Sequence, residues 1–352
     1  MKLDFTKKLL SWHHKTNNRA LPWKGEKDPY RIWLSEIILQ QTRVEQGTAY
    51  YQRFIKKFPT VQDLASAGEK EVFKTWEGLG YYSRCRNLIS SAQKIVGQHE
   101  GRFPSGYEEL LLLPGVGHYT AAAIASFAFQ LPHAVVDGNV ERILSRYFGV
   151  ALEKQSAAGR RIYASLAEEL LDKNQPGVYN QAIMDFGATV CKPQNPLCSQ
   201  CVLSASCQAY LNDWTSALPV KKAIKERTVR HFNYIIAGPD SKKVWIRKRE
   251  GKDIWNNLYE LILLETVKNL PQDQIVKTDF FRLHFGNRRI GIRSVSPEFS
   301  QTLTHQHIRA RFIVVDAPLD VIEGYQPVSL RHIALYPFPR IIAQEGLNLL
   351  PR

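Results

Sequence analysis

The apolar positions of this chain repeat with two different periods, one before about residue 211 and one after about residue 230. In the first part they recur at the three- and four-residue spacing of amphipathic helices, and β-branched runs are few. In the second part short alternating runs predict strands, as at Asn233 to Ala237 and Val244 to Lys248. A third run places Ile308 and Phe312 on the side opposite to Arg309. We therefore expect a multi-domain chain, with an all-α domain followed by an α+β domain.

One helix can be placed from its start signals. Asp28 is a typical N-cap residue, and Pro29 suits the first turn, where its missing N–H is not needed. Apolar residues follow at helical spacing, and the pattern predicts that this helix runs on to Gln41. Glu36 lies mid-helix among Ile and Leu residues, so we expect its carboxyl group to be buried.

The change of pattern divides the chain into three segments. Residues 1–217 are expected to form the helical domain, 218–229 a linker and 230–352 the α+β domain. The linker is indicated by one proline and several cations, namely Pro219, Lys221, Lys222, Lys225 and Arg227. A length of 352 residues, roughly twice that of a typical domain, agrees with two domains.

Charge points to a polyanionic partner. The net charge is +14, and residues from Leu218 onward carry 22 basic and 13 acidic side chains, or +9 of that total. Nucleic acid is the favoured partner, ahead of an anionic membrane surface, and a basic surface that serves only solubility is the alternative. No apolar stretch approaches the roughly 20 residues that span a bilayer, and a signal-peptide apolar region is lacking, so we expect a cytoplasmic protein with no membrane contact.

Four of the five cysteines fall within 17 residues, at Cys191, Cys198, Cys201 and Cys207. Soft thiolates on a short loop select zinc or an iron–sulfur cluster, whereas disulfides are disfavoured in a reducing compartment. Zinc sites more often use two close cysteine pairs, and only Cys198 and Cys201 form one here. The spacing therefore favours a [4Fe-4S] cluster with a structural role, and zinc remains the alternative.

A glycine-rich turn separates two helical stretches at Leu113-Pro-Gly-Val-Gly-His-Tyr-Thr. Gly115 and Gly117 permit a tight turn whose backbone N–H groups, together with the next helix N-terminus, can hold a phosphate. The alternative is an ordinary helix–helix turn.

Two carboxyl groups are expected to have opposite protonation states. Asp137, in Val136-Asp-Gly-Asn-Val, lies at or beside a helix N-cap, where backbone N–H groups and the helix dipole favour its ionised form. Burial of Glu36 disfavours its charged form and keeps a proton available at neutral pH. One acid and one anion form a pair that can cleave a glycosidic bond. A plain cap and a partly exposed helix charge are the alternatives.

These segments, together with Ser35-Glu-Ile-Ile-Leu-Gln-Gln-Thr and Gly78-Leu-Gly-Tyr-Tyr-Ser-Arg, resemble MutY-type adenine DNA glycosylases over about the first 210 residues. The resemblance implies the helix-hairpin-helix glycosylase fold of the endonuclease III superfamily, with a [4Fe-4S] cofactor. It also implies an enzyme of base excision repair that removes adenine mispaired with 8-oxoguanine or guanine in double-stranded DNA. Asymmetric duplex lesions suit a monomer.

The same resemblance assigns roles to side chains. Glu36 would protonate adenine N7, and Asp137 would stabilise the oxocarbenium ion, supported by Tyr119 and Asn139. Because the endonuclease III branch has a lysine where Tyr119 stands, we expect a monofunctional enzyme without strand cleavage. DNA contacts are expected from two side chains that wedge into the duplex, Gln41 and Tyr81. Further contacts are expected from the hairpin residues Gly115, Gly117 and His118. His118 stands where the family usually has an arginine.

The second domain resembles the family's Nudix-like domain through Val244 to Arg249 and Trp255 to Glu260. The acidic array with which a pyrophosphatase holds magnesium is missing, so we expect recognition and no hydrolysis. Leu303-Thr-His stands where the family often has Phe-Ser-His at the 8-oxoguanine contact. Thr304 and His305 are therefore the expected lesion contacts, and a polar loop is the alternative.

Two rival functions share parts of this pattern. A mismatch thymine glycosylase of the same superfamily can have the cysteine loop and a tyrosine at the hairpin, although Glu36 and the long C-terminal domain favour the adenine enzyme. The other rival is a non-catalytic iron–sulfur protein that senses DNA damage.

Overall fold

The computed structural model describes residues 2–154, 156–220, 226–238, 242–286, 290–316 and 322–350. It divides into two compact units, Met1–Ser66 with Arg86–Ala223, and Ala67–Cys85 with Ile224–Arg352. The sequence pattern did not single out residues 67–85, which group with the second unit. Residues 221–225 of the expected linker lie outside the described residues.

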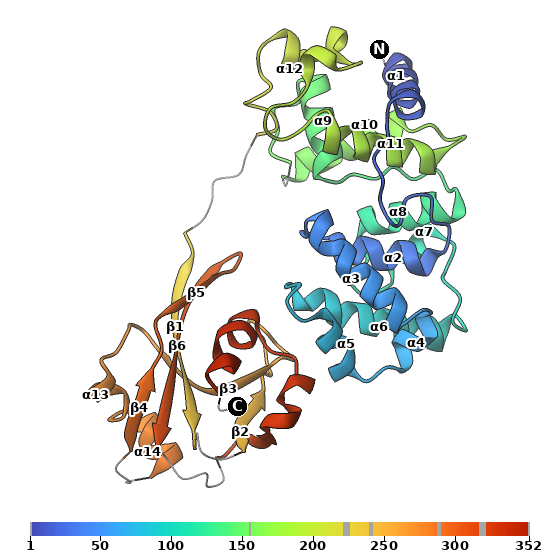
Figure 1. Cartoon of the computed structure of the whole chain (residues 1–352). Coiled ribbons are helices and arrows are strands. Elements are labelled where there is room, and N and C mark those ends of the chain that lie inside the picture. The colour runs from blue at the N-terminus through green and yellow to red at the C-terminus, as the bar shows by residue number, and fades with distance from the viewer. Residues whose placement is uncertain are drawn as a thin grey trace. The chain divides into compact units, whose positions relative to one another are not determined.

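The first unit is helical (Figure 1). Its helices are α1 (Lys2–Lys15), α2 (Pro29–Leu39), α3 (Val44–Lys57), α4 (Val61–Ser66), most of α6 (Tyr82–Gln98), α7 (Tyr107–Leu111), α8 (His118–Phe129), α9 (Gly138–Phe148), α10 (Ala157–Leu170), α11 (Pro176–Thr189) and α12 (Gln208–Leu211). Two 3₁₀ turns, Cys198–Gln200 and Ser204–Ser206, lie in the cysteine loop. Within the described ranges, no helix combines the length and the apolar character that crossing a bilayer requires.

Helix α2 begins as predicted but is shorter than predicted. The Asp28 carboxylate accepts a hydrogen bond from the backbone N–H of Tyr30, and Pro29 occupies the first turn. The helix ends at Leu39, so the placement of Gln41 on it was wrong. Gln41 adopts a left-handed backbone conformation with φ of 56°, and the polar run after Leu39 turns the chain toward α3.

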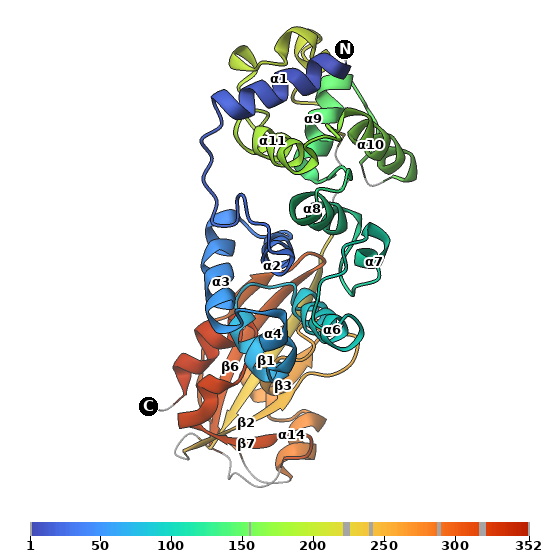
Figure 2. The same cartoon turned by 90° about the vertical axis from the view of Figure 1, so that its right-hand side faces the viewer.

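One core cluster of the first unit is formed by α1 and by helices from the second half of the unit. Phe5 and Leu9 of α1 pack with Ile143 of α9, Tyr163 of α10 and Phe186 of α11. Figure 2 shows α1 lying across the other helices of this group, although it is far from them in the sequence. Helix α11 contacts both α8 and α9, and α8 contacts α2. The side chains of four separate segments can therefore reach one cavity.

Helices α9 and α11 approach closely at Gly187. A Cβ atom at this position would lie 2.6 Å from Cβ and 3.2 Å from Cα of Asn139, on the first turn of α9. Real Cβ atoms do not approach other atoms to 2.6 Å, so any larger residue must displace α9. Gly187 thus fixes how near the start of α9 lies to α11.

The second unit is built on a mixed sheet. Its elements are α5 (Glu69–Trp76), β1 (Thr228–Ala237), β2 (Lys243–Lys248), β3 (Tyr259–Thr266), α13 (Gln272–Ile275), α14 (Asp279–Phe285), β4 (Gly291–Val295), β5 (Phe299–Thr302), β6 (Gln306–Asp316) and β7 (Gln326–Ser329), followed by short helical turns at Leu330–Leu335, Ile342–Gly346 and Leu347–Leu349. The strand order is β4-β6-β1-β3-β2-β7, with β5 also paired to β6. The pair β1 and β6 is parallel, with Tyr234 opposite Phe312, and the other pairs are antiparallel.

Both faces of the sheet are covered by apolar residues. On one face Ile235, Ile262 and Ile313 pack with Phe281 and Phe285 of α14. On the other face the Tyr234 and Phe312 rings stack, and a Cβ atom on Gly346 would lie within 3 Å of the Phe312 ring. The predicted alternation in β6 is confirmed, because Ile308, Ala310 and Phe312 are buried while Arg309 is exposed.

The close approach at Gly187 predicts a difference between two helical Gly→Ala substitutions. Gly187→Ala should lower the free energy of unfolding by about 1–3 kcal/mol, because it overpacks the α9–α11 contact. Gly97→Ala, on an exposed part of α6 with no atom within 4 Å of the new Cβ, should raise it by about 0.5–1 kcal/mol. Urea unfolding of both variants measures this, and a stable Gly187→Ala variant would contradict the packing argument.

Candidate active site

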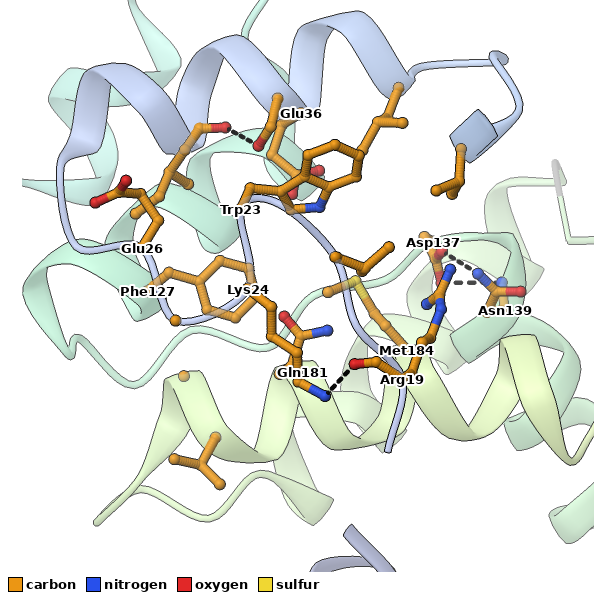
Figure 3. Close-up of a pocket in the computed structure, with 18 of the residues that line it drawn as sticks. Arg19, Trp23, Lys24, Glu26, Glu36, Phe127, Asp137, Asn139, Gln181 and Met184 are labelled. Atoms are coloured by element: carbon orange, nitrogen blue, oxygen red, sulfur yellow. Dashed lines mark hydrogen bonds between the residues drawn. The ribbon is translucent and has the colours of Figure 1, made fainter. Parts of the chain in front are cut away.

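A cavity of about 370 Å³ lies in the first unit and is lined by residues of α1, α2, α8, α9, α11 and the connection between α1 and α2. The four residues predicted to carry the chemistry, Glu36, Tyr119, Asp137 and Asn139, all line it. In Figure 3 Glu36 reaches down from α2, while Asp137 and Asn139 stand at the start of α9. Two carboxyl groups about a hundred positions apart in the sequence therefore share one cavity.

Glu36 is the buried carboxyl group of this cavity. Its residue is 7% exposed, and burial raises its pKa to about 7. The Tyr119 hydroxyl donates a 2.6 Å hydrogen bond to Oε2, which partly opposes this rise, and the charge of Asp137 adds to it. Burial likewise holds the pKa of Tyr119 well above its ordinary value, so Tyr119 stays a hydrogen-bond donor. Glu36 can therefore carry a proton near neutral pH.

Asp137 is the N-cap of α9. Its Oδ1 accepts hydrogen bonds from the backbone N–H groups of Asn139 at 2.9 Å and Val140 at 2.8 Å. Its Oδ2 accepts one from Asn139 Nδ2 at 2.7 Å. Three N–H donors and the helix N-terminus thus hold the carboxylate in one orientation.

Arg142 supports this cap and was not predicted from the sequence. Its guanidinium donates to Asn139 Oδ1 at 2.8 Å, to Gly187 O at 2.7 Å and to Cys191 O at 2.7 Å. Because Asn139 Oδ1 is held by Arg142, the Asn139 amide must present its Nδ2 to Asp137. A charged residue one turn into an amphipathic helix gives no sign of such contacts in a single sequence.

The sequence pattern also did not predict the other residues that line the cavity. Arg19, Trp23 and Lys24 come from the connection between α1 and α2, and Gln181 and Met184 come from α11. This connection has neither helix nor strand apart from turns, so it has no hydrophobic period to indicate which side chains point inward.

The hairpin residues lie outside the cavity. Gly115 has φ of +75°, and a Cβ there would lie 2.7 Å from Asn87 Cβ, so both conformation and space require glycine. Gly117 is the N-cap of α8, and the exposed His118 begins that helix with its Nδ1 3.0 Å from the Tyr107 hydroxyl. The turn therefore exposes the α8 N-terminus next to a titratable ring.

The other predicted DNA contacts also lie outside the cavity, on exposed positions. Gln41 in the first unit and Tyr81 in the second both adopt left-handed backbone conformations, with φ of 56° and 48°. Tyr81 is 45% exposed, and its hydroxyl lies 3.3 Å from Thr304 Oγ1 within the second unit. Thr304 and His305 are both exposed. The structure thus brings Tyr81 and the Thr304 loop together.

The four clustered cysteines line one small cavity of about 30 Å³ together with Leu197. Burial, with the neighbouring thiols, raises the pKa of Cys201 to about 11. Arg146 donates from Nη1 to Cys191 Sγ at 3.5 Å. In the part of the chain that the structure describes, no three His, Cys, Asp or Glu side chains are grouped as for a single metal ion.

Comparison with known proteins first defines the class. Residues 34–168 match the HhH-GPD superfamily base excision DNA repair protein family, a span that contains Glu36, the hairpin and Asp137. The chain is also similar to a solved thermostable thymine-DNA glycosylase, with 31% identity and a TM-score of 0.55 over 60% of this chain and 96% of that one. An endonuclease III–DNA complex shares the fold, with 20% identity and a TM-score of 0.52 over 60% of this chain and 98% of that one.

Curated relatives then define the family. An adenine DNA glycosylase of Buchnera aphidicola is 34% identical over 257 residues, which are 73% of each chain. The human adenine DNA glycosylase is 46% identical over 214 residues, covering 58% of this chain and 39% of the human protein. The chain belongs to the adenine DNA glycosylase family.

Burial of Glu36 predicts a pH-dependent effect on stability. Because its pKa rises from 4.5 to about 7 on folding, its protonation stabilises the fold below pH 4.5, and this stabilisation is lost as the pH rises through 7. The loss amounts to about 3 kcal/mol. Glu36→Gln, which is neutral at every pH, should therefore unfold at a higher temperature than the wild type at pH 8 and at a similar temperature at pH 4.5.

Circular dichroism melts at the two pH values measure this difference. Glu45→Gln, on an exposed position of α3, is the matched control and should show little difference. A gap between Glu36→Gln and wild type that does not grow with pH would show that folding does not raise the pKa of Glu36.

Proposed function

We propose that this protein is a monofunctional DNA glycosylase that hydrolyses the N-glycosidic bond of adenine paired with 8-oxoguanine or guanine in duplex DNA, and that it acts as a monomer. The observation that carries the proposal is a buried Glu36 with a pKa of about 7 in the same cavity as the capped carboxylate of Asp137. The family membership supports the same reaction.

Glu36 supplies the proton in this reaction. Adenine is a poor leaving group until N7 is protonated, so an acid that keeps its proton at neutral pH lowers the barrier to bond cleavage. The Tyr119 hydroxyl occupies Oε2, which leaves Oε1 to carry the proton. The electrons of the broken C1′–N9 bond stay with the protonated adenine, and the sugar is left as an oxocarbenium ion.

Asp137 stabilises that cation. Its carboxylate is held by three N–H donors, so it does not need to reorganise when positive charge develops on the sugar. Water then adds to C1′ and loses a proton to the Glu36 carboxylate, which completes the hydrolysis and restores the acid. Because Tyr119 stands at the position of the endonuclease III lysine, no amine is offered there for a Schiff base. The cavity does hold Lys24, but its Nζ is bound to Arg19 O and to Asp185.

DNA binding is supported by charge and by exposed residues. The net charge of +14 suits a phosphate backbone, and the α8 N-terminus at Gly117 and His118 can contact a phosphate. Gln41 and Tyr81 are exposed and suit the filling of space that a flipped adenine leaves in the duplex.

The second unit would act as a Nudix-like recognition domain. Thr304 and His305, beside Tyr81, would contact 8-oxoguanine. The acidic side chains of β3 favour recognition over metal-dependent hydrolysis, because Glu260 pairs with Arg247 and Arg249, and Glu265 with Arg230. These carboxylates therefore form ion pairs with arginines, in place of the metal ion that a pyrophosphatase would bind.

A [4Fe-4S] cluster fits the cysteine loop. Four soft sulfur donors, Cys191, Cys198, Cys201 and Cys207, line one cavity, and such a set suits a cluster. When bound, the cluster would supply four iron–thiolate bonds that close the loop. The Arg146 side chain adds hydrogen bonds to Lys192 O at 2.8 Å and Pro193 O at 3.3 Å on the same loop.

Release of a free base tests the function. The wild type should release adenine from duplexes with A opposite 8-oxoguanine or G, without nicking the strand, and Glu36→Gln should bind these duplexes but release adenine at least 100-fold more slowly. Above pH 7 the wild-type rate should fall as Glu36 ionises. Single-turnover assays measure both effects. Release of thymine from a G·T duplex would favour a thymine glycosylase, and binding without release of any base would favour a damage sensor.

Visible absorption tests the cofactor. Protein purified without oxygen should absorb broadly near 400 nm, as iron–sulfur clusters do (about four irons per chain). Cys198→Ser should reduce both absorption and iron content, whereas Cys85→Ser, a buried cysteine outside the loop, should leave them unchanged. If the purified protein contains stoichiometric zinc and shows no visible absorption, the cysteine loop holds zinc and the cluster proposal is wrong.

A further inference from the structure

Asp185, on α11, is a fully buried carboxylate to which no role has been assigned above. Its Oδ1 accepts hydrogen bonds from Arg19 Nη1 at 2.8 Å and Gln181 Nε2 at 3.1 Å. Its Oδ2 accepts one from Asn17 Nδ2 at 2.8 Å and lies 3.1 Å from Lys24 Nζ. Two cations and two amides therefore surround one negative charge.

Most of these donors belong to the wall of the active-site cavity. Arg19, Lys24 and Gln181 line it together with Glu36 and Asp137, and Figure 3 shows all five side chains in that cavity. The connection that carries Arg19 and Lys24 has no helix or strand to hold it. Asp185 is thus the group that ties this wall to α11.

The charges of the wall matter to the reaction. Arg19 and Lys24 are only partly exposed, at 24% and 26% of their side chains, and they share a cavity with two carboxyl groups. A cation that was not paired with Asp185 would be attracted to the carboxyl groups of the cavity, which are Glu26, Glu36 and Asp137. Pairing with Glu36 would stabilise its ionised form and remove the proton from the acid.

We propose that Asp185 is a positioning residue of the active site, which holds Arg19 and Lys24 in the cavity wall so that neither cation pairs with Glu36 or Asp137. This inference rests on the proposed function, since it concerns the same acid. It predicts that the charge of Asp185, and not only its hydrogen bonds, sets the protonation of Glu36.

The charged and titratable groups around this site come from six segments. They are His13 of α1, Arg19, Lys24, Glu26 and Lys27 of the connection, Glu36 of α2, Tyr119 of α8, Asp137 of α9 and Asp185 of α11. Burial and the charge of Lys24 lower the pKa of His13, while the charge of Asp185 partly opposes this, so the neutral form of His13 is favoured. When Asp185 is replaced by a neutral residue, the carboxyl groups of the cavity are the anionic partners that remain in this set for Arg19 and Lys24.

The test compares Asp185→Asn, Lys24→Met and the double variant with the wild type. The pH at which Glu36 ionises is measured in two ways, from single-turnover adenine release between pH 5.5 and 8.5 and from the ¹³C carboxyl signal of Glu36, assigned with Glu36→Gln. Asp185→Asn should lower this midpoint by about one pH unit, which makes release about tenfold slower above pH 7. Lys24→Met should move it little, and adding Lys24→Met to Asp185→Asn should bring it back part of the way.

The matched control is Asp4→Asn on α1, which removes the same charge from a side chain that is 49% exposed and should leave the midpoint unchanged. If Asp185→Asn does not fold, the double variant is compared with Lys24→Met alone, since the freed Arg19 should then lower the midpoint. A uniform loss of rate at all pH values with an unchanged midpoint would overturn the proposal and leave Asp185 with a purely structural role. Failure of the wild type to release adenine would instead overturn the proposed function, while the ¹³C titration would still test Asp185.

Discussion

The chemistry of the cavity in the first unit depends on the burial of one carboxyl group against apolar helices. Glu36 lies on α2 between Ile32, Ile37 and Ile38, all of which are buried, so its ionised form has lost most of its hydration. The Tyr119 hydroxyl compensates only in part. A group that would be an ordinary carboxylate on the surface thus becomes an acid near neutral pH. The same burial makes the fold less stable when the proton leaves, so the proposed catalytic use of Glu36 and the stability of the fold oppose each other at this position.

The second carboxyl group is controlled by a different means. Asp137 is not deeply buried, but the first turn of α9 surrounds it with N–H donors. Its position depends on Asn139, which depends in turn on Arg142 and on the close packing of α9 against Gly187. A hydrophobic environment for one carboxyl group and a hydrogen-bonding one for the other suit two similar side chains to the different roles proposed for them. The difference between the two groups comes from the fold around them and not from their chemistry.

Local signals in the sequence were sufficient for the parts of the site that follow local rules. The start of α2 follows from Asp28 and Pro29, the cap of α9 from Asp137, and the turn at Gly115 from its glycines. The strands of the second unit follow from the alternation around Ile308. In each case the residues that determine the geometry lie within a few positions of one another. The helix end at Leu39 was missed because Gln40 and Gln41 do not interrupt a helical pattern.

Contacts between distant segments could not be predicted in this way. The connection from residue 16 to residue 28 reaches the cavity through Arg19, Trp23 and Lys24, and its main anchor lies on α11, more than 150 positions away. Likewise, residues 67–85 are helical in pattern, yet they group with the sheet unit, where Glu77 accepts a hydrogen bond from Phe338 N. In a single sequence, neither segment of such a pair shows a pattern that indicates contact with the other.

The packing at Gly187 has a consequence for how sequence variants of this protein are interpreted. A glycine near the end of a helix has no side chain, and Gly187 lies outside the cavity lining, so a substitution there would be classed as neutral by its chemistry. Because Gly187 has no side chain, Asn139 can pack closely against it, and Asn139 in turn orients the Asp137 carboxylate. Adding one CH₂ group at this position, as in Gly187→Ala, would therefore disturb the candidate active site. Surveys that weigh only charged or reactive residues would overlook it.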